Sequence, residues 1–278
     1  MTRTQQDKAR LFHTLHRSGD PLLLANVWDA LGARLVAAGG AAAIATASAS
    51  VSWTLGSPDG DQADRAEVLA RTAQVVRAAG ELPVTADLES GFADTAAGVG
   101  ATVDALLATG AVGINLEDGA HGGGEPLRPA AEAAERIGAA RVAADAAGVA
   151  LFVNARTDVF LRAVGDPSER LEHAVARARA YVEAGADGVF VPGVTAPETV
   201  AALVGALAAP LNVLAGPGAP AAGELAKLGV ARISLGPGPA RAAYTALARA
   251  AEEFRVDGTY GAIEGALDYG RLNGLFTG

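Results

Sequence analysis

Short apolar runs alternate with longer alanine-rich stretches along nearly the whole chain, and this alternation strongly limits the possible folds. The apolar runs have the length of β-strands, whereas the stretches between them carry polar residues at helical spacing. The predicted strands cover residues 22–28, 42–47, 83–89, 113–118, 150–157, 188–192, 211–215 and 232–235. The predicted helices cover residues 29–38, 64–79, 94–109, 130–147 and 167–184, and a helical pattern also follows each of the last three strands.

The predicted strands are apolar almost throughout, which is typical of parallel strands buried on both faces. Eight strand–helix units at this spacing predict an α/β fold, a (β/α)8 barrel, whose active site lies at the carboxyl ends of the strands. We expect one domain over residues 1–278. The segment 256–278 exceeds what the eighth unit needs. We predict that this C-terminal extension is helical and packs on a partner subunit, in a homodimer or homotetramer.

The composition excludes several classes of protein. Half of the 278 residues are hydrophobic and 19% are charged, so the chain can bury a large core and disorder is not expected. The net charge of -9 argues against nucleic acid as the main partner. Because there is no cysteine, disulfides, thiolate metal sites and cysteine nucleophiles are excluded. The polar segment 1–10 and the lack of a long apolar run predict a cytoplasmic protein that binds no membrane.

Acidic side chains stand at the ends of two successive predicted strands. Asp87 and Glu89 are two residues apart and therefore point the same way from the third strand, and Glu117 ends the fourth. Carboxylates beside apolar strands are costly unless a cation neutralises them. Three hard oxygen donors favour Mg2+ or Mn2+, so we predict a metal site formed by Asp87, Glu89 and Glu117. The alternative is that these acids cap the following helices.

A second polar group ends the fifth predicted strand. Asn154 and Arg156 share one face by the two-residue period. The planar guanidinium of Arg156 is suited to binding the carboxylate of a small substrate. The alternative is an ion pair with a neighbouring acid that only keeps the barrel mouth neutral. Asp59, in the loop after the second strand, is expected at the same mouth.

The loop 119–129 follows the fourth predicted strand. Its three consecutive glycines permit large backbone motion, as a lid that closes over substrate needs. Closure would bring His121, Glu125 and Arg128 into the site. The alternative, for His121 in particular, is a place in a surface loop.

Five short motifs lie at the predicted strand ends. They are Asn26-Val27-Trp28-Asp29-Ala30, Gly56-Ser57-Pro58-Asp59, Asp87-Leu88-Glu89-Ser90-Gly91-Phe92, Leu116-Glu117-Asp118 and Asn154-Ala155-Arg156-Thr157-Asp158. In this order they resemble the motifs of the isocitrate lyase/phosphoenolpyruvate mutase superfamily, over about residues 11–250. The resemblance implies a Mg2+-dependent enzyme that acts on 2-oxo acids or their enolates, and relatives that exchange their eighth helix between subunits.

The resemblance also implies roles for particular residues. Asp87 would bind the metal directly or through water, with help from Asp59, Glu89 and Glu117. Arg156 would bind a carboxylate and stabilise an enolate oxygen. The backbone near Ser48 and Ala49 would receive a carboxylate, although alanine here replaces the family's glycine. The candidate substrate-binding residues are therefore Ser48, Ala49, Trp28, Asn154 and Arg156. The candidate catalytic residues are Arg156, Glu117, Asp59 and His121.

The loop after the fourth strand departs from the family pattern. Lyases of the family carry Lys-Lys/Arg-Cys-Gly-His there, and phosphonopyruvate enzymes use lysine and asparagine, whereas this chain has Gly122 to Gly124 and Glu125. The metal and enolate part of the site is retained. We therefore predict a Mg2+-dependent carbon–carbon lyase or decarboxylase acting on a small 2-oxo or 2-hydroxy dicarboxylic acid such as oxaloacetate. Two alternatives remain: a phosphorus–carbon enzyme similar to phosphonopyruvate mutase or hydrolase, and a 2-oxo-acid-binding protein with little turnover.

Overall fold

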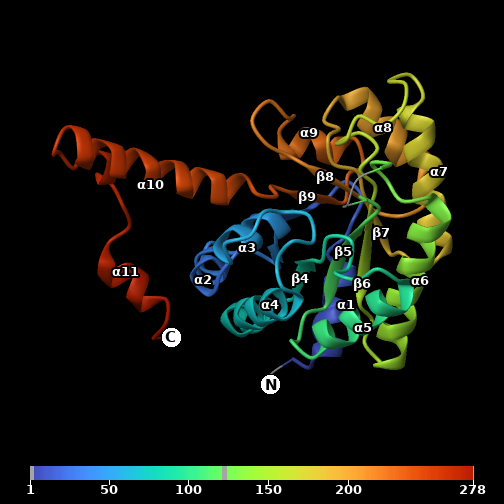
Figure 1. Ribbon diagram of the computed structural model, residues 1–278, viewed down its shortest axis with the longest axis horizontal. Coiled ribbons are helices and arrows are strands. Elements are labelled where there is room, and N and C mark those ends of the chain that lie inside the picture. The colour runs from blue at the N-terminus through green and yellow to red at the C-terminus, as the bar shows by residue number, and fades with distance from the viewer. Residues whose placement is uncertain (1–2, 121–123, 278) are drawn as a thin grey trace.

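The computed structural model describes residues 3–120 and 124–277, which form a parallel sheet curled into a nearly closed barrel (Figure 1). The strands are β1 (Leu22–Leu24), β2 (Asn26–Val27), β3 (Ile44–Thr46), β4 (Val84–Asp87), β5 (Gly113–Glu117), β6 (Phe152–Arg156), β7 (Gly188–Phe190), β8 (Leu211–Leu214) and β9 (Arg232–Ser234). Their order in the sheet is β1-β9-β8-β7-β6-β5-β4-β3-β2. The α/β barrel that the sequence predicts is confirmed.

The sheet has nine strands rather than eight because the first predicted strand is interrupted at Ala25. β1 pairs with β9 and β2 pairs with β3, so one stretch of chain lies along both ends of the sheet. The Asn26 side chain supports this junction. Its Oδ1 accepts hydrogen bonds from the N–H groups of Leu235 and Gly236 at 3.0 and 2.8 Å, and its Nδ2 donates to the carbonyl of Thr46 at 2.7 Å.

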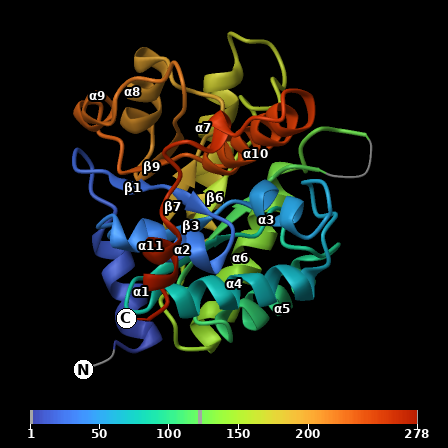
Figure 2. The ribbon, with the colours of Figure 1, turned by 90° about the vertical axis from the view of Figure 1, so that its left-hand side faces the viewer.

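Helices cover most of the outside of the barrel (Figures 1 and 2). They are α1 (Gln5–Thr14), α2 (Ala30–Ala38), α3 (Ser48–Thr54), α4 (Arg65–Ala79), α5 (Ala96–Leu107), α6 (Ala130–Ala146), α7 (Arg170–Glu183), α8 (Pro197–Ala206) and α9 (Ala222–Lys227). Asp29 and Asp64 cap α2 and α4 by accepting hydrogen bonds from first-turn N–H groups. α1 packs on the amino ends of the strands, where Phe12 is fully buried against Phe152. In the described part of the chain, we find no helix with the length and apolarity needed to cross a membrane.

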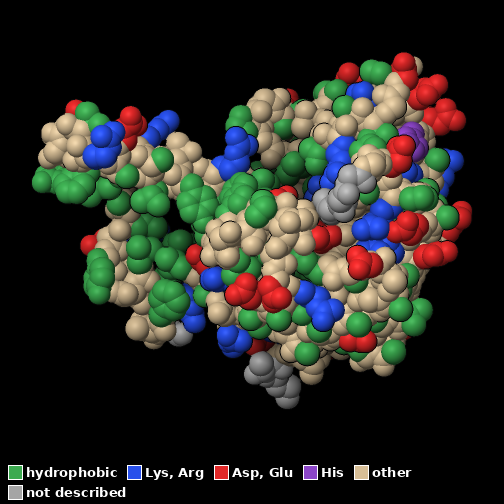
Figure 3. Space-filling model, viewed as in Figure 1, with side chains coloured by type: hydrophobic (Ala, Val, Ile, Leu, Met, Phe, Trp, Pro, Cys, Tyr) green, Lys and Arg blue, Asp and Glu red, His purple; other side chains and the backbone are tan. Residues whose placement is uncertain are grey.

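A helical arm extends away from the barrel after β9 (Figure 1). It consists of α10 (Gly238–Val256), a 3-10 turn η1 (Gly261–Ile263) and α11 (Tyr269–Gly274). Among the residues of α10, Ala240 alone is buried. Large apolar side chains along the arm are exposed, including Leu247 at 64% and Phe254 at 63%, and they gather on one side of it (Figure 3). The C-terminal helical segment is therefore present, and it projects from Gly238 onward.

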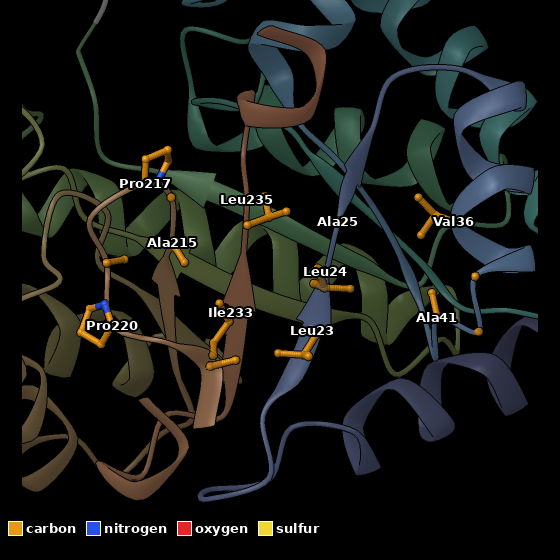
Figure 4. A pocket seen from close by; sticks show the side chains of 15 residues that line it. Leu23, Leu24, Ala25, Val36, Ala41, Ala215, Pro217, Pro220, Ile233 and Leu235 are labelled. Carbon is orange, nitrogen blue, oxygen red and sulfur yellow. The ribbon is translucent and has the colours of Figure 1, made fainter. Parts of the chain in front are cut away.

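The outward course of α10 leaves part of the barrel uncovered. In a (β/α)8 barrel the helices form a closed outer ring around the strands. Here the outer faces of β1 and β9 border a groove of about 820 Å³ between α2 and α9 (Figure 4). We call this the outer groove; its apolar lining includes Leu23, Val36, Pro217, Pro220, Ile233 and Leu235. Leu23 points into it and is 55% exposed.

Candidate active site

A cavity of about 170 Å³ opens at the carboxyl ends of the strands. This volume suits a small metabolite, because sites for larger, drug-sized ligands usually exceed about 300 Å³. The polar residues that line it are Asn26, Ser48, Asp59, Asp87, Asn115, Arg156 and Ser234. The apolar side chains with the largest surfaces are Leu161, Phe190, Pro192, Leu214 and Pro237. Five of the sequence-predicted residues thus line one cavity: Ser48, Ala49, Asp59, Asp87 and Arg156.

Asp87 lies at the end of β4 and faces the start of α3. Its Oδ2 accepts a hydrogen bond from the N–H of Ser48 at 3.1 Å, and its own N–H donates to Oγ1 of Thr46 at 3.0 Å. Its Oδ1 is buried and has no hydrogen-bond partner among the described residues. A buried carboxylate oxygen without a donor is costly unless a cation or a substrate group meets it. The Asp87 carboxylate is therefore well suited to bind a cation.

Glu89 turns away from the cavity toward the loop after α3. Its Oε2 accepts hydrogen bonds from the N–H groups of Gly60, at 2.7 Å, and Asp61, and its backbone has a φ of +50°. Burial raises the pKa of Glu89 to about 8, and the charges of Asp59, Asp61 and Asp87 add to this rise, although the hydrogen bond from Asp61 opposes it. Glu89 therefore fixes the loop that carries Asp59, and its second oxygen is buried without a partner among the described residues.

Arg156 sits between two carboxylates. Its Nη1 lies 2.7 Å from Oε2 of Glu117, and its Nε lies 2.6 Å from Oδ1 of Asp158. Burial lowers the pKa of Arg156, but the facing charges of Glu117 and Asp158 outweigh burial and raise it. The guanidinium also lies 5.7 Å from the centroid of the Phe190 ring. Arg156 therefore carries a permanent positive charge into the cavity, in an orientation that its neighbours fix.

Asp118, the second acid of the Glu117–Asp118 pair, supports the site through hydrogen bonds. Oδ2 of Asp118 accepts hydrogen bonds from the Tyr181 hydroxyl at 2.7 Å and from Nη1 of Arg177 at 3.1 Å, both on α7. Its Oδ1 accepts the N–H of Asp158 at 2.9 Å. Asp118, just after β5, thus links α7 to the backbone of Asp158, the residue that orients Arg156.

Amide and guanidinium groups form a layer one step deeper in the barrel. Nδ2 of Asn154 donates to Oδ1 of Asn115 at 2.9 Å and to Oδ1 of Asn212 at 3.1 Å. Nη2 of Arg232 donates to Oδ1 of Asn115 at 3.2 Å. Burial lowers the pKa of Arg232 to about 9, and the charge of Asp87 opposes this shift. Asn154, a candidate for substrate contact, is 1% exposed and does not line the cavity, so its place here is to orient Asn115.

The remaining sequence candidates lie apart from the cavity lining. Trp28 is half-buried, and its ring centroid lies 6.5 Å from that of Tyr244, in the second turn of α10. Glu117 reaches the site through Arg156 rather than through the lining itself. His121 lies outside the described residues. Sequence reasoning missed Asn26, Asn115 and Ser234, although Asn115 shares a strand face with Glu117 by the two-residue period.

The donor set fits a cation held mainly by one carboxylate. Within residues 3–120 and 124–277, no three histidine, aspartate or glutamate side chains converge in a way that could hold a metal ion. Asp87, with its unpartnered oxygen in the cavity, is the described residue that would contact Mg2+, and hydrated Mg2+ commonly uses only one or two carboxylates. Asp59 lines the same cavity and would act through water.

Comparison with known proteins finds relatives that match most of the chain. The sequence model of the family described as phosphoenolpyruvate phosphomutase matches residues 12–255. An uncharacterized protein of Mycobacterium tuberculosis is 39% identical over 241 residues, which cover 86% of this chain and 87% of that protein. The structure of a lyase/mutase-like protein of Burkholderia cenocepacia has a TM-score of 0.91 and 39% identity, covering 99% of this chain and 97% of its own. A phosphonopyruvate hydrolase in complex with oxalate and Mg2+ has a TM-score of 0.83 and 25% identity, covering 99% of this chain and 95% of its own.

Proposed function

We propose a specific activity for this chain, which belongs to the phosphoenolpyruvate mutase/isocitrate lyase superfamily: that of a Mg2+-dependent carbon–carbon lyase or decarboxylase. Matching members are named as lyases, hydrolases and mutases, so membership alone leaves the reaction open. The proposed substrate is a small 2-oxo or 2-hydroxy acid. Oxaloacetate, the dicarboxylate expected from the sequence, is one of the compounds to test.

One observation carries the proposal: a carboxylate with an unpartnered buried oxygen, Asp87, lines the same small cavity as the fixed guanidinium of Arg156. A cation at Asp87 and a positive charge at Arg156 together suit an acid whose reaction builds negative charge on oxygen. The relative that binds both oxalate and Mg2+ supports this pairing of ligands.

The chain's own residues would act by binding and electrostatics. Arg156 would hold the substrate's oxygen atoms and stabilise the negative charge of an enolate, because its orientation is already set by Glu117 and Asp158. Bound Mg2+ supplies polarisation of the 2-oxo group. Asn26 and Ser234 add hydrogen-bonding groups to the cavity wall. Cleavage that leaves an enolate needs no strong acid from the loop 119–129.

The test is a screen of 2-oxo and 2-hydroxy acids with and without Mg2+, following pyruvate, CO2 and glyoxylate together. We expect Mg2+-dependent formation of at least one of these products, and loss of the reaction on chelation. Phosphate release from phosphonopyruvate would instead favour phosphorus–carbon chemistry. Tight Mg2+-dependent binding of 2-oxo acids without any product would favour a binding protein.

We also propose that the protein is a homo-oligomer in which the arm of one subunit covers another. α10 has an exposed apolar side, and the outer groove is an exposed apolar surface at the position where a last barrel helix would pack. Leaving both surfaces in water is unfavourable, because patches of this size are usually buried in an interface. Exchange of α10 between two copies would cover both at once.

A further inference from the structure

The active-site cavity is polar along one part of its circumference and apolar along the other. The polar part lies between β2 and β6: Asn26 comes from β2, Asp87 from β4, Asn115 from β5 and Arg156 from β6. The apolar part comes from β7, β8 and the loops after β6, β7 and β9: Phe190 ends β7, Leu214 ends β8, Leu161 follows β6, and Pro192 and Pro237 follow β7 and β9. Ser234 is the polar exception, and its hydroxyl accepts a hydrogen bond from Nδ2 of Asn212 at 3.2 Å.

No charged side chain lines the apolar part of the cavity. Arg232 of β9 is buried below the cavity, where it donates to Asn115. Arg162, which follows Leu161, donates to Asp158 and to the carbonyl groups of Ala120 and Pro126.

Segments 188–197, 211–223 and 233–240 contain no Lys, Arg, His, Asp or Glu. The backbone also offers few donors at the start of α10, because Pro237 and Pro239 have no N–H. The N–H of Gly236 donates to Asn26 at 2.8 Å, and that of Gly238 donates to the carbonyl of Leu235 at 3.1 Å. An anionic group would find no charged partner from these segments.

We infer that this uncharged part of the cavity selects the substrate by its tail: the end of the acid that lies there is a short alkyl group and not a second carboxylate. The inference rests on the proposed function, in which the carboxylate and the 2-oxo or 2-hydroxy group occupy the polar part. A carboxylate buried without a partner is strongly disfavoured. Each methylene buried against Phe190 and Leu214 should instead tighten binding about fourfold. The small volume limits the tail to a few carbons.

The test compares binding of four acids in the presence of Mg2+ by calorimetry. Oxalate reports on the polar part alone, pyruvate adds a methyl group, and 2-oxopentanoate and 2-oxoglutarate share a chain length but end in methyl and carboxylate. We expect 2-oxopentanoate, which has two more methylenes, to bind about fifteenfold more tightly than pyruvate. We expect it to bind at least about tenfold more tightly than 2-oxoglutarate.

Different binding results would contradict the inference and the proposed function. If oxalate binds but 2-oxoglutarate binds as tightly as 2-oxopentanoate or more tightly, the inference is wrong and the proposed function stands. Absence of Mg2+-dependent oxalate binding would overturn the proposed function and the inference with it.

A charge placed in the apolar part provides a second measurement. Leu214 is half-buried at the end of β8, so Leu214→Arg would bring a cation to the tail. We expect the ratio of affinities to shift at least about tenfold toward 2-oxoglutarate. Val142→Arg, on the surface of α6 where Val142 is 69% exposed, makes the same change in net charge and should leave the ratio unaltered. An unaltered ratio in a folded Leu214→Arg protein contradicts the inference; if that variant does not fold, the four-acid comparison decides.

Discussion

The Arg156 guanidinium meets the Asp158 carboxylate at two points, with Nε 2.6 Å from Oδ1 and Nη2 3.0 Å from Oδ2. The two residues are two apart in the sequence, at the end of β6 and just after it. Glu117, on the neighbouring strand β5, forms an ion pair with Nη1 of Arg156. Three of the five N–H groups of the guanidinium are thus engaged before any ligand arrives. Arg156 is therefore preorganised, and a substrate would meet the N–H groups that these acids leave.

Replacing Arg156 by lysine tests whether the residue stabilises the transition state or only anchors the substrate. Arg156→Lys keeps the charge but loses the planar fork that faces Asp158. We expect kcat/KM to fall by about 10² to 10³, the typical effect of removing one stabilising donor, while oxalate affinity falls less. Kinetics and oxalate titration of the same preparation provide the measurement. Equal losses in both would show that Arg156 only anchors substrate.

The Tyr181 hydroxyl should influence the site through Asp118. Tyr181 is fully buried and donates to Oδ2 of Asp118, whose other oxygen holds the N–H of Asp158. Tyr181→Phe should lower the free energy of unfolding by about 1–2 kcal/mol and reduce kcat more than oxalate affinity. A stability loss without any change in kcat would limit Tyr181 to a structural role.

Asp87→Ala tests whether the Asp87 carboxylate binds Mg2+. Asp87 lies at the barrel mouth and contributes no apolar packing, so the variant should fold while losing Mg2+-dependent oxalate binding. Titration of Mg2+ and oxalate against the variant, together with its melting curve, gives both readings. Asp104→Ala, at an exposed position on α5, is the control for loss of one acid. If Asp87→Ala unfolds the protein and Asp104→Ala does not, Asp87 is a structural cap.

The barrel could be predicted from the sequence because its strands are apolar on both faces and its helices begin at recognisable caps. Asp64, for example, precedes α4 and accepts the N–H groups of Ala66 and Glu67. α3 escaped prediction because Ser48 to Thr54 is rich in serine and β-branched residues, which have weak helix propensity. Its first N–H group instead meets the carboxylate of Asp87, a contact that exists only after the barrel has formed.

The orientation of individual side chains at the site is harder to predict than their strands. Asp87 and Glu89 are two residues apart, and a regular strand would point them the same way. β4 ends at Asp87, however, and the left-handed backbone at Glu89 sends its carboxylate to the N–H groups of Gly60 and Asp61. Arg232 was also not anticipated, because a charged residue inside an apolar strand is rarely buried without an acidic partner.

The arm should control assembly. Leu247 and Phe254 are exposed on α10, so Leu247→Glu and Phe254→Glu place charge on the surface proposed to cover the outer groove of another copy. We expect sedimentation to show an oligomer for the unaltered protein and a shift toward the 27.7 kDa species for each variant. Val142→Glu, on the exposed surface of α6, is the control. An unaltered protein that sediments only as a 27.7 kDa species at micromolar concentration would reject the proposal.

His16 should make the fold sensitive to acid. Its ring stacks on Phe152, with centroids 3.9 Å apart, and burial, aided by the charge of Arg232, lowers its pKa to about 3. The folded protein therefore keeps His16 neutral, whereas the unfolded chain takes up a proton below its usual pKa of 6.5. The stabilising contribution is complete above that pKa and is lost as the pH falls from there toward 3, by up to about 1.4 kcal/mol per pH unit.

Urea unfolding at several pH values between about 7 and 5 measures this loss. His16→Phe keeps an aromatic ring against Phe152 but cannot be protonated, so its free energy of unfolding should decline less steeply with falling pH. His13→Gln changes the other histidine on α1 and retains His16, so it should decline as the unaltered protein does. Parallel pH profiles for the unaltered protein and His16→Phe would show that acid sensitivity arises elsewhere.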